Sequence, residues 1–452
     1  MRLVREAEVE AGPTPAPEAS GAAVGVLRDG RLAGLDPAEL AERFGTPAYV
    51  YDLDVVTRQV AALRAALPEV FDLAYAVKAN PNLAVLRHLG SLGLGADVAS
   101  GGELRHTVRA GISPERVVFT GPGKRDEELT AAVEAGVRVV TVESVGELRR
   151  LAVIAEGLGR RQPVLLRAAM PDAARHERVR IIGDEGAGKF GMDSADLRVA
   201  ASEAVASLWL EPLGLHAFGA SNLLDAAALA SHIEGTVDAA AGLAAEAGFD
   251  LLLVDCGGGL GIPYADDEAA LDLGLLRSLL GSFAARLAED GATAGARLLL
   301  EPGRFLVGSA GAYLARVTDR KRVGGREVVI LDGGIHHVLR PALVGQEHRV
   351  RVVTGPASEA SAIPGLPVTV AGPLCSGLDV FAQSAAMAAP EVGDLVAVLD
   401  VGAYGATESM PFFLSHALPA EVAVRGGVAW LARPSVDPDT WLEWQTGEPP
   451  AG

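Results

Sequence analysis

One lysine, Lys78, lies where an apolar, alternating run at residues 74–77 ends. Such a run predicts a buried strand, and the Asn80, Pro81 and Asn82 that follow would end it. A partly desolvated lysine at the carboxyl end of a strand is suited to form a covalent bond with a carbonyl group. Taken alone, the position also fits an ordinary surface lysine. The chemical interpretation therefore depends on the rest of the chain.

Polar and glycine-rich groups follow several later apolar runs. The glycines at 257–259 leave backbone N–H groups uncovered, which suits a phosphate, although they could form only a tight turn. Ser221 could add a hydroxyl group there or cap a helix. Glu301 could pair with Arg304 in solvent, or could keep a pyridine nitrogen protonated. A covalent lysine, a phosphate nest and a buried carboxylate are together what pyridoxal phosphate requires.

Three more charged groups stand near such strand ends. Asp97 and Glu103 could cap a helix, or could position the lysine. Arg167 ends another apolar run, and it is costly to bury without a carboxylate or phosphate partner. We therefore expect all three in the same site if their strands belong to one barrel.

Composition excludes several classes of protein. The chain has 452 residues, is 49% hydrophobic and carries a formal charge of -19. A globular protein is expected, and the charge argues against a nucleic-acid or anionic-membrane partner. Two cysteines are too few for a disulfide framework, so a reducing compartment is expected. The start of the chain lacks the apolar core of a signal peptide, and no run approaches transmembrane length, so we expect a cytoplasmic protein.

The elements that would position these groups alternate between strand and helix. Eight short apolar runs alternate with Ala/Leu-rich helical runs between residues 51 and 304, which predicts an α/β fold with a closed (β/α)8 barrel. A doubly wound open sheet is the alternative, although the chain lacks its dinucleotide glycine motif after the first strand. In a barrel, the strand ends meet at one mouth. The runs are residues 73–77, 95–98, 117–120, 137–142, 164–168, 213–217, 251–255 and 297–301.

The remaining segments predict further units. Residues 305–440 contain short Val-rich runs separated by Gly or Pro, which predicts an antiparallel β-domain. Residues 23–50 contain a helix at 37–44 and a strand that would contribute to that domain. Residues 1–22 and 441–452 are expected to be tails, the first of them disordered.

Five motifs in this order resemble the fold-type III pyridoxal-phosphate decarboxylases, which include diaminopimelate and ornithine decarboxylases. They are residues 75–80 (YAVKAN), 256–259 (CGGG), 301–304 (EPGR), 375–379 (CSGLD) and 402–405 (GAYG). The resemblance runs from about residue 25 to 425. It implies an alanine-racemase-like barrel followed by a β-domain, pyridoxal 5'-phosphate as cofactor, no metal, and an obligate homodimer with shared active sites.

The resemblance also implies roles for single residues. Lys78 would be the Schiff-base lysine, Glu301 the partner of the pyridine nitrogen, and Cys375 the proton donor in the partner subunit's site. Without the resemblance, Cys375 would be interpreted as a small buried hydrophobe. The other implied cofactor-binding residues are Asp97, Arg167, His216, Phe218, Ser221, Gly257, Gly258, Gly259, Gly303, Arg304 and Tyr404. The implied substrate-binding residues are Arg304, Arg340, Ser376 and Asp379.

Three departures from the family pattern bear on the substrate. Phe218 replaces a ring-stacking histidine, so it can stack but cannot donate a hydrogen bond. Val344 stands where the diaminopimelate enzyme has tyrosine, and Ser376 stands where both branches have an acidic residue. A distal ammonium group would lose a charged partner, worth about 2–4 kcal/mol if desolvated. Residues 405–416 resemble decarboxylases of secondary metabolism, some of which act on carrier-bound aminoacyl groups.

The first hypothesis is therefore α-decarboxylation of an amino acid or of an aminoacyl group on an acyl carrier protein, in secondary metabolism. One alternative is diaminopimelate decarboxylase of lysine biosynthesis. Another is an amino-acid racemase on the same fold, which would need acid/base groups on both faces of the cofactor. A non-enzymatic cofactor-binding protein is disfavoured, since the single-barrel binding proteins lack the β-domain.

Overall fold

Eight parallel strands form a closed barrel in the computed structural model, which describes residues 25–169, 189–219, 221–358, 366–445 and 447. The predicted barrel is therefore confirmed, and the open sheet is excluded because β11 pairs with β4 and closes the ring. The predicted tail at residues 1–22 lies outside the described residues. The strands are β4 (Phe71–Ala76), β5 (Gly95–Val98), β6 (Val117–Phe119), β7 (Val139–Val142), β8 (Gln162–Arg167), β9 (Leu210–His216), β10 (Leu253–Asp255) and β11 (Arg297–Leu300).

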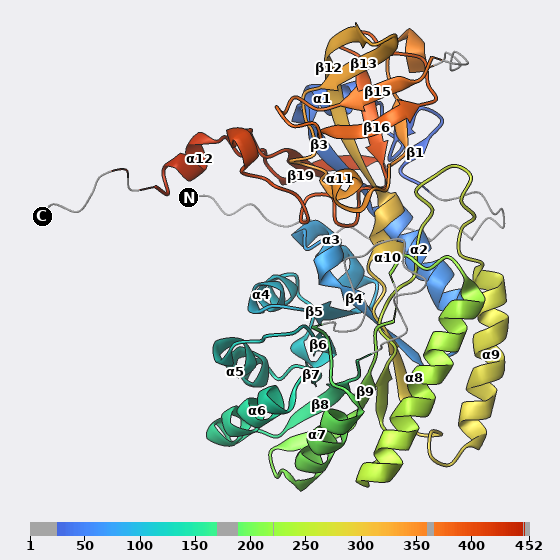
Figure 1. Ribbon diagram of the computed structural model, residues 1–452, viewed down its shortest axis with the longest axis vertical. Coiled ribbons are helices and arrows are strands. Elements are labelled where there is room, and N and C mark those ends of the chain that lie inside the picture. Colours follow the sequence, from blue (N-terminus) through green and yellow to red (C-terminus); the bar gives the residue numbers. More distant parts are fainter. Residues whose placement is uncertain (1–24, 170–188, 220, 359–365, 446, 448–452) are drawn as a thin grey trace, which may run out of the picture.

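Eight helices of the described chain surround the barrel, and all but α5 begin at a side chain that caps them (Figure 1). At α4, the Ser100 hydroxyl accepts from the Glu103 N–H, while the Glu103 carboxylate accepts from the Ala99 N–H. Glu103 therefore helps to cap the start of α4, which is the first of its two predicted roles. The helices are α2 (Leu53–Ala66), α3 (Leu83–Ser91), α4 (Gly101–Arg109), α5 (Asp126–Ala135), α6 (Val145–Leu158), α7 (Ser194–Ala206), α8 (Ala226–Ala247) and α9 (Leu273–Glu289).

A second sheet forms the β-domain above the barrel in Figure 1. Its order is β16-β15-β13-β12-β3-β18-β19, with β17 paired to β12 and β14. Strand β3 (Ala48–Asp52) precedes the barrel and pairs with β12 and β18. The other strands are β12 (Gly311–Val323), β13 (Arg326–Leu331), β14 (Val350–Val352), β15 (Val368–Ala371), β16 (Val380–Ala385), β17 (Leu395–Leu399), β18 (Ala420–Arg425) and β19 (Val428–Arg433).

The β-domain differs from the prediction in three details. Two pairs, β13 with β15 and β18 with β3, are parallel, because these strands are joined by long connections rather than by hairpins. Strands β16 and β19 were not predicted. The chain after the barrel forms α10 (Arg304–Val307) and a 3-10 turn (Gly308–Ala310) before β12 begins. The domain is therefore mostly, not wholly, antiparallel.

The turn that carries Lys78 is held by the β-domain of the same chain. The Tyr404 N–H donates to the Ala79 carbonyl at 2.7 Å, and the Asn80 side chain donates to the Gly402 carbonyl at 3.0 Å. A Cβ at Gly402 would lie 1.8 Å from the Val307 carbonyl oxygen, so only glycine permits this approach. The two parts of the chain thus meet at the barrel mouth.

No helix in the described part of the chain is both long and apolar enough to cross a membrane.

Candidate active site at the barrel mouth

Lys78 lies in a 3-10 turn (Val77–Ala79) directly after β4. Its Nζ donates to Asp97 at 2.7 Å, and its side chain is 40% exposed whereas that of Asp97 is fully buried. The Thr120 hydroxyl donates to the other oxygen of Asp97. Burial alone would lower the pKa of Lys78, but the Asp97 and Glu301 carboxylates raise it above its ordinary value. Lys78 is therefore a charged amine, fixed in direction and reachable from the mouth.

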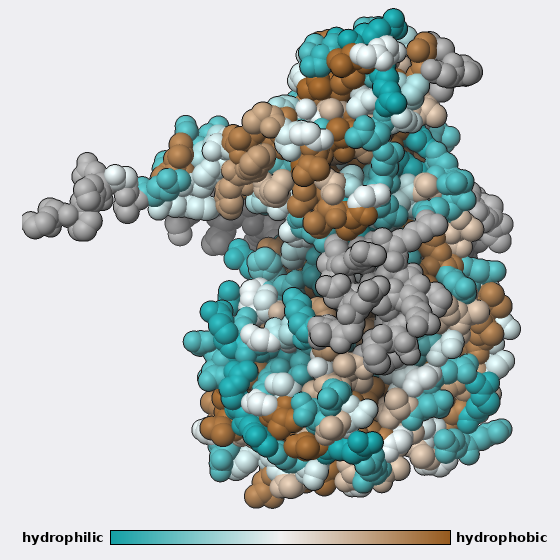
Figure 2. All heavy atoms as spheres, viewed as in Figure 1, coloured by the Kyte–Doolittle hydropathy of each residue, from teal (hydrophilic) through white to brown (hydrophobic). Residues whose placement is uncertain are grey.

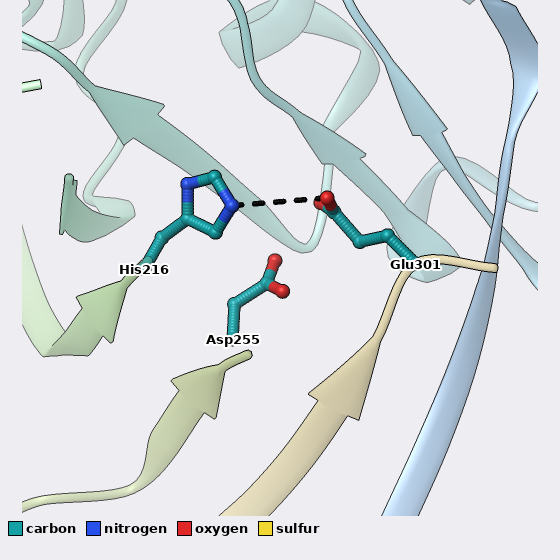
Figure 3. A group of neighbouring side chains, drawn as sticks. All are labelled: His216, Asp255 and Glu301. Carbon is teal, nitrogen blue, oxygen red and sulfur yellow. Dashed lines mark ion pairs between the residues drawn. The ribbon is translucent and has the colours of Figure 1, made fainter. Parts of the chain in front are cut away.

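Three ionisable groups gather on the floor of the mouth (Figure 3). His216 ends β9, Asp255 ends β10, and Glu301 directly follows β11. The His216 Nε2 lies 3.7 Å from a Glu301 oxygen. Both His216 nitrogens and one oxygen of each carboxylate are buried without a hydrogen-bond partner among the described residues. Asp255 was not predicted as a site residue, although it ends a strand of the same barrel.

Burial dominates the protonation of these groups. It raises the pKa of Asp255 to about 7, and with the neighbouring carboxylates it raises the pKa of Glu301 well above its usual range. It lowers the pKa of His216, which is therefore neutral. Two buried carboxyl groups with free oxygens favour a cation beside them. A protonated pyridine nitrogen meets that requirement.

The glycine run after β10 forms a cradle in which side chains do not fit. Gly257 has φ +66°, and a Cβ there would lie 2.8 Å from the Phe218 ring. A Cβ at Gly258 would lie 2.4 Å from the Glu301 carbonyl oxygen. The Gly257 N–H donates to an Asp255 oxygen at 2.9 Å, whereas the Gly258 and Gly259 N–H groups have no hydrogen-bond partner among the described residues. Backbone N–H groups left open in this way suit a phosphate. Phe218 thus lies against the cradle, at the place where the family resemblance put a ring-stacking residue.

Ser221, Gly303 and Arg304 border the same cradle. The Arg304 Nη2 lies 3.3 Å from the Ser221 hydroxyl. A Cβ at Gly303 would lie 3.0 Å from that of Ala79, beside Lys78. The cradle, the lysine and the carboxylate floor therefore fit pyridoxal phosphate at its phosphate, aldehyde and ring-nitrogen ends.

Arg167 has a carboxylate partner that the sequence did not identify. Its Nη1 lies 2.6 Å from Glu143, and Glu143 also accepts from the Gly191 N–H at 3.1 Å. The guanidinium stacks on the Phe190 ring at 4.7 Å. Because Arg167 and His216 are paired across β8 and β9, Arg167 lies beside the group formed by His216, Asp255 and Glu301.

Two more arginines lie on the β-domain side of the mouth. The Cζ atoms of Arg304 and Arg340 lie 4.8 and 5.4 Å from the centroid of the Tyr404 ring. Arg304 donates to the Tyr264 hydroxyl at 2.5 Å, and Arg340 pairs with Glu408 at 3.0 Å. Tyr264 and Glu408 were not among the predicted residues. Glu408 could have been noticed as an acidic residue four positions after Tyr404.

Three predicted residues lie apart from this group within the described chain. Cys375 is exposed, and no described contact joins it to Lys78 or to the carboxylate floor. The Ser376 hydroxyl accepts from the Leu378 N–H at 3.3 Å. Asp379 is buried, and its two oxygens each accept a backbone N–H at 2.7 Å, from Ile335 and Leu374. The Asp379 carboxylate therefore joins its own loop to the backbone at Ile335. Its role in substrate binding stays a prediction.

The chain is similar to known proteins in sequence and in fold. Residues 53–308 match the family model described as "Pyridoxal-dependent decarboxylase, pyridoxal binding domain". The chain is 34% identical over 399 residues to the diaminopimelate decarboxylase of Zymomonas mobilis, covering 87% of this chain and 91% of the relative. It is 33% identical over 406 residues to the L-glutamyl-(BtrI acyl-carrier protein) decarboxylase of Niallia circulans, covering 88% and 94%. The structure of the Helicobacter pylori diaminopimelate decarboxylase complexed with L-lysine aligns with a TM-score of 0.81 at 30% identity, covering 91% and 100%.

Proposed function

The chain belongs to the pyridoxal-dependent decarboxylases and is an amino-acid lyase that uses pyridoxal phosphate, and on this premise we propose that its substrate is diaminopimelate. The relatives that bear this activity in their names support the proposal. It replaces the carrier-linked substrate as the first hypothesis, because the comparisons favour the alternative. The family also argues against the racemase.

The pair of buried arginines is the main observation in support of diaminopimelate as the substrate. Arg304 and Arg340 are both buried and both face Tyr404, whose backbone is bonded to the turn that holds Lys78. Buried guanidinium groups require anionic partners. A dicarboxylic amino acid whose α-amine lies at Lys78 would bring a distal carboxylate to these arginines.

Different residues of the mouth would then hold the cofactor and supply the proton. When bound, pyridoxal phosphate accepts the electrons that the carboxylate leaves behind. Lys78 would hold the cofactor, the 257–259 cradle its phosphate, and Glu301 the proton on its ring nitrogen. The bond between the α-carbon and its carboxylate breaks, carbon dioxide leaves, and a proton from Cys375 of the partner subunit takes its place. For diaminopimelate the product is lysine.

We also propose a homodimer, since Cys375 is exposed and would need a second chain to reach a mouth. Apolar residues on the β-domain side support an interface there. Phe412 is 55% exposed, Leu378 65% and Trp444 70%. Figure 2 shows brown residues gathered on the β-domain and on the arm that leads to the C-terminus. Such a concentration is typical of protein interfaces.

A carrier-bound aminoacyl group is the second candidate, and a specific observation favours it. Ser376 provides no charge for a distal ammonium, and Val344 provides no hydroxyl group at the end of α11 (Arg340–Val344). A substrate without a free distal head group would not need either one. The named activity of the Niallia circulans relative is consistent with such a substrate.

Carbon dioxide release tests the two candidates directly. The enzyme, loaded with pyridoxal phosphate, is given meso-diaminopimelate, L-ornithine, L-glutamate and L-glutamyl-acyl carrier protein in parallel. We expect diaminopimelate to yield carbon dioxide and lysine in equal amounts. Release from the carrier-bound substrate alone would reject diaminopimelate in favour of the second candidate, and product that keeps both carboxylates would indicate a racemase.

A further inference from the structure

Arg340 has unused hydrogen-bonding capacity in a buried place. Its side chain is 2% exposed, and only Nη1 has a carboxylate partner, Glu408. The Nε and Nη2 groups are buried without a partner among the described residues. Leaving buried donors unpaired is costly, so these two N–H groups favour an acceptor that the described part of the chain does not supply. The edge of a guanidinium fits a carboxylate through two parallel hydrogen bonds.

Glu408 has an unused hydrogen-bond acceptor. One of its oxygens binds Arg340, and no described residue bonds to the other. The side chain is 24% exposed, so Glu408 is not sealed off from solvent as Arg340 is. A carboxylate held by one arginine can still accept hydrogen bonds from an ammonium group. Arg340 and Glu408 together therefore present donors and an acceptor side by side.

We propose that Arg340 and Glu408 form a subsite for a zwitterionic amino-acid head at the far end of the substrate, with Arg340 binding its carboxylate and Glu408 its ammonium. The proposal rests on the proposed function and makes it more specific. It assigns Glu408 as a specificity-determining residue. The neighbouring positive charge of Arg304 keeps the subsite attractive to the carboxylate even after Glu408 neutralises one arginine.

This subsite removes the main objection to diaminopimelate. Ser376 leaves the distal ammonium without the acidic partner expected after Cys375. Glu408 supplies such a partner from a different segment, four residues after Tyr404, whose ring contacts Arg340. The negative charge that is missing at Ser376 is thus present at Glu408.

Three ligands of matched length test the two halves of the subsite separately. L-lysine carries both groups of the distal head, 6-aminohexanoate lacks the α-ammonium, and cadaverine lacks the carboxylate. Binding to the loaded enzyme is measured by calorimetry for wild type, Glu408→Gln, Glu408→Asp and Thr407→Ala. Thr407 is exposed and adjacent, so Thr407→Ala controls for general disturbance of the segment.

We expect Glu408→Gln to weaken L-lysine binding by about 10-fold or more, because the ammonium loses a charged partner. Binding of 6-aminohexanoate should stay within about twofold or tighten, since the amide no longer neutralises Arg340. Glu408→Asp should restore part of the L-lysine affinity, and Thr407→Ala should match wild type. Equal losses for L-lysine and 6-aminohexanoate, or no loss for L-lysine, would overturn the subsite.

The same data separate this inference from the proposed function. If Glu408 governs L-lysine binding but wild type releases no carbon dioxide from diaminopimelate, the subsite stands and the substrate is wrong. If wild type decarboxylates diaminopimelate and Glu408→Gln leaves L-lysine binding unchanged, the substrate stands and the subsite is wrong.

Discussion

At the scale of single residues, the chemistry of the mouth depends on side chains and glycines that follow the barrel strands. Lys78, Glu301 and the glycines at 257–259 each follow an apolar run, so their convergence follows from a barrel. Asp255 occupies the same kind of position and was missed, because a sequence does not show which strand-end carboxylates turn inward. Asp379 shows the reverse case, since only coordinates reveal that backbone N–H groups use its carboxylate.

Glu301 provides a test of how its charge is used. Its pKa is raised in the protein alone, and glutamine mimics the protonated, neutral form. If Glu301 works as an anion beside a protonated ring nitrogen, Glu301→Gln should lower kcat by about 10²-fold or more while the cofactor stays bound. Steady-state kinetics and the absorbance of bound cofactor measure the two effects.

Asp72→Asn is the matched control, because Asp72 pairs with Arg138 and Arg297 and belongs to the other end of β4. It should keep kcat within about twofold, as expected of a surface pair. An unchanged kcat in Glu301→Gln would show that Glu301 acts as a neutral acid and contradict the assignment.

At the scale of elements, the local sequence pattern predicted many of the strands and helices. It did not predict which distant strands pair with each other. The helix at 37–44 was predicted with the bounds that the structure shows for α1 (Pro37–Phe44), since Asp36 caps it and Gly45 ends it. Strand β3 lies between β12 and β18, which come more than 250 residues later in the chain. No local signal specifies such neighbours, or the parallel pairing of β3 with β18.

The hydrogen bonds that join the β-domain to the turn of Lys78 lead to a prediction at this scale. Asn80→Asp keeps the oxygen that accepts from the Asn82 N–H but replaces the donor to Gly402 with a carboxylate. The buried carbonyl would lose its partner, at a cost of about 1–3 kcal/mol. We expect faster cofactor release on dilution and a lower kcat, measured by absorbance and by initial rates.

Asn82→Ser serves for comparison, since serine can still cap α3 while the side-chain bond to Glu421 is lost. It should lower the thermal midpoint without changing kcat. If Asn80→Asp retains cofactor and turns over like wild type, the β-domain does not position Lys78.

At the scale of the whole molecule, the proposed homodimer would bring Cys375 of one subunit to the mouth of the other. The lysine, cradle and carboxylate floor meet at one mouth, whereas Cys375 lies exposed and apart from them. Composition and periodicity cannot specify such an assembly, because they describe one chain. The family resemblance alone led to the expectation of shared sites.

Mixed dimers test that proposal. Lys78→Ala and Cys375→Ser homodimers should each be nearly inactive, since every site lacks one group. After subunit exchange, a two-fold dimer that shares its sites should recover about a quarter of wild-type activity, because half the dimers carry one intact site. Carbon dioxide release before and after exchange gives the answer. Activity that never exceeds the sum of the separate variants would place Cys375 outside the partner's site.

The most direct test of the central claim is to locate the cofactor's covalent bond. Borohydride converts the link between pyridoxal phosphate and its lysine into a stable amine, which peptide mass spectrometry then identifies. We predict the added mass on Lys78 alone, which is reachable from the mouth, and none on Lys124, whose Nζ is buried and bound to Glu147. A label on Lys124 or Lys189, with Lys78 unmodified in a fully active enzyme, would contradict the account.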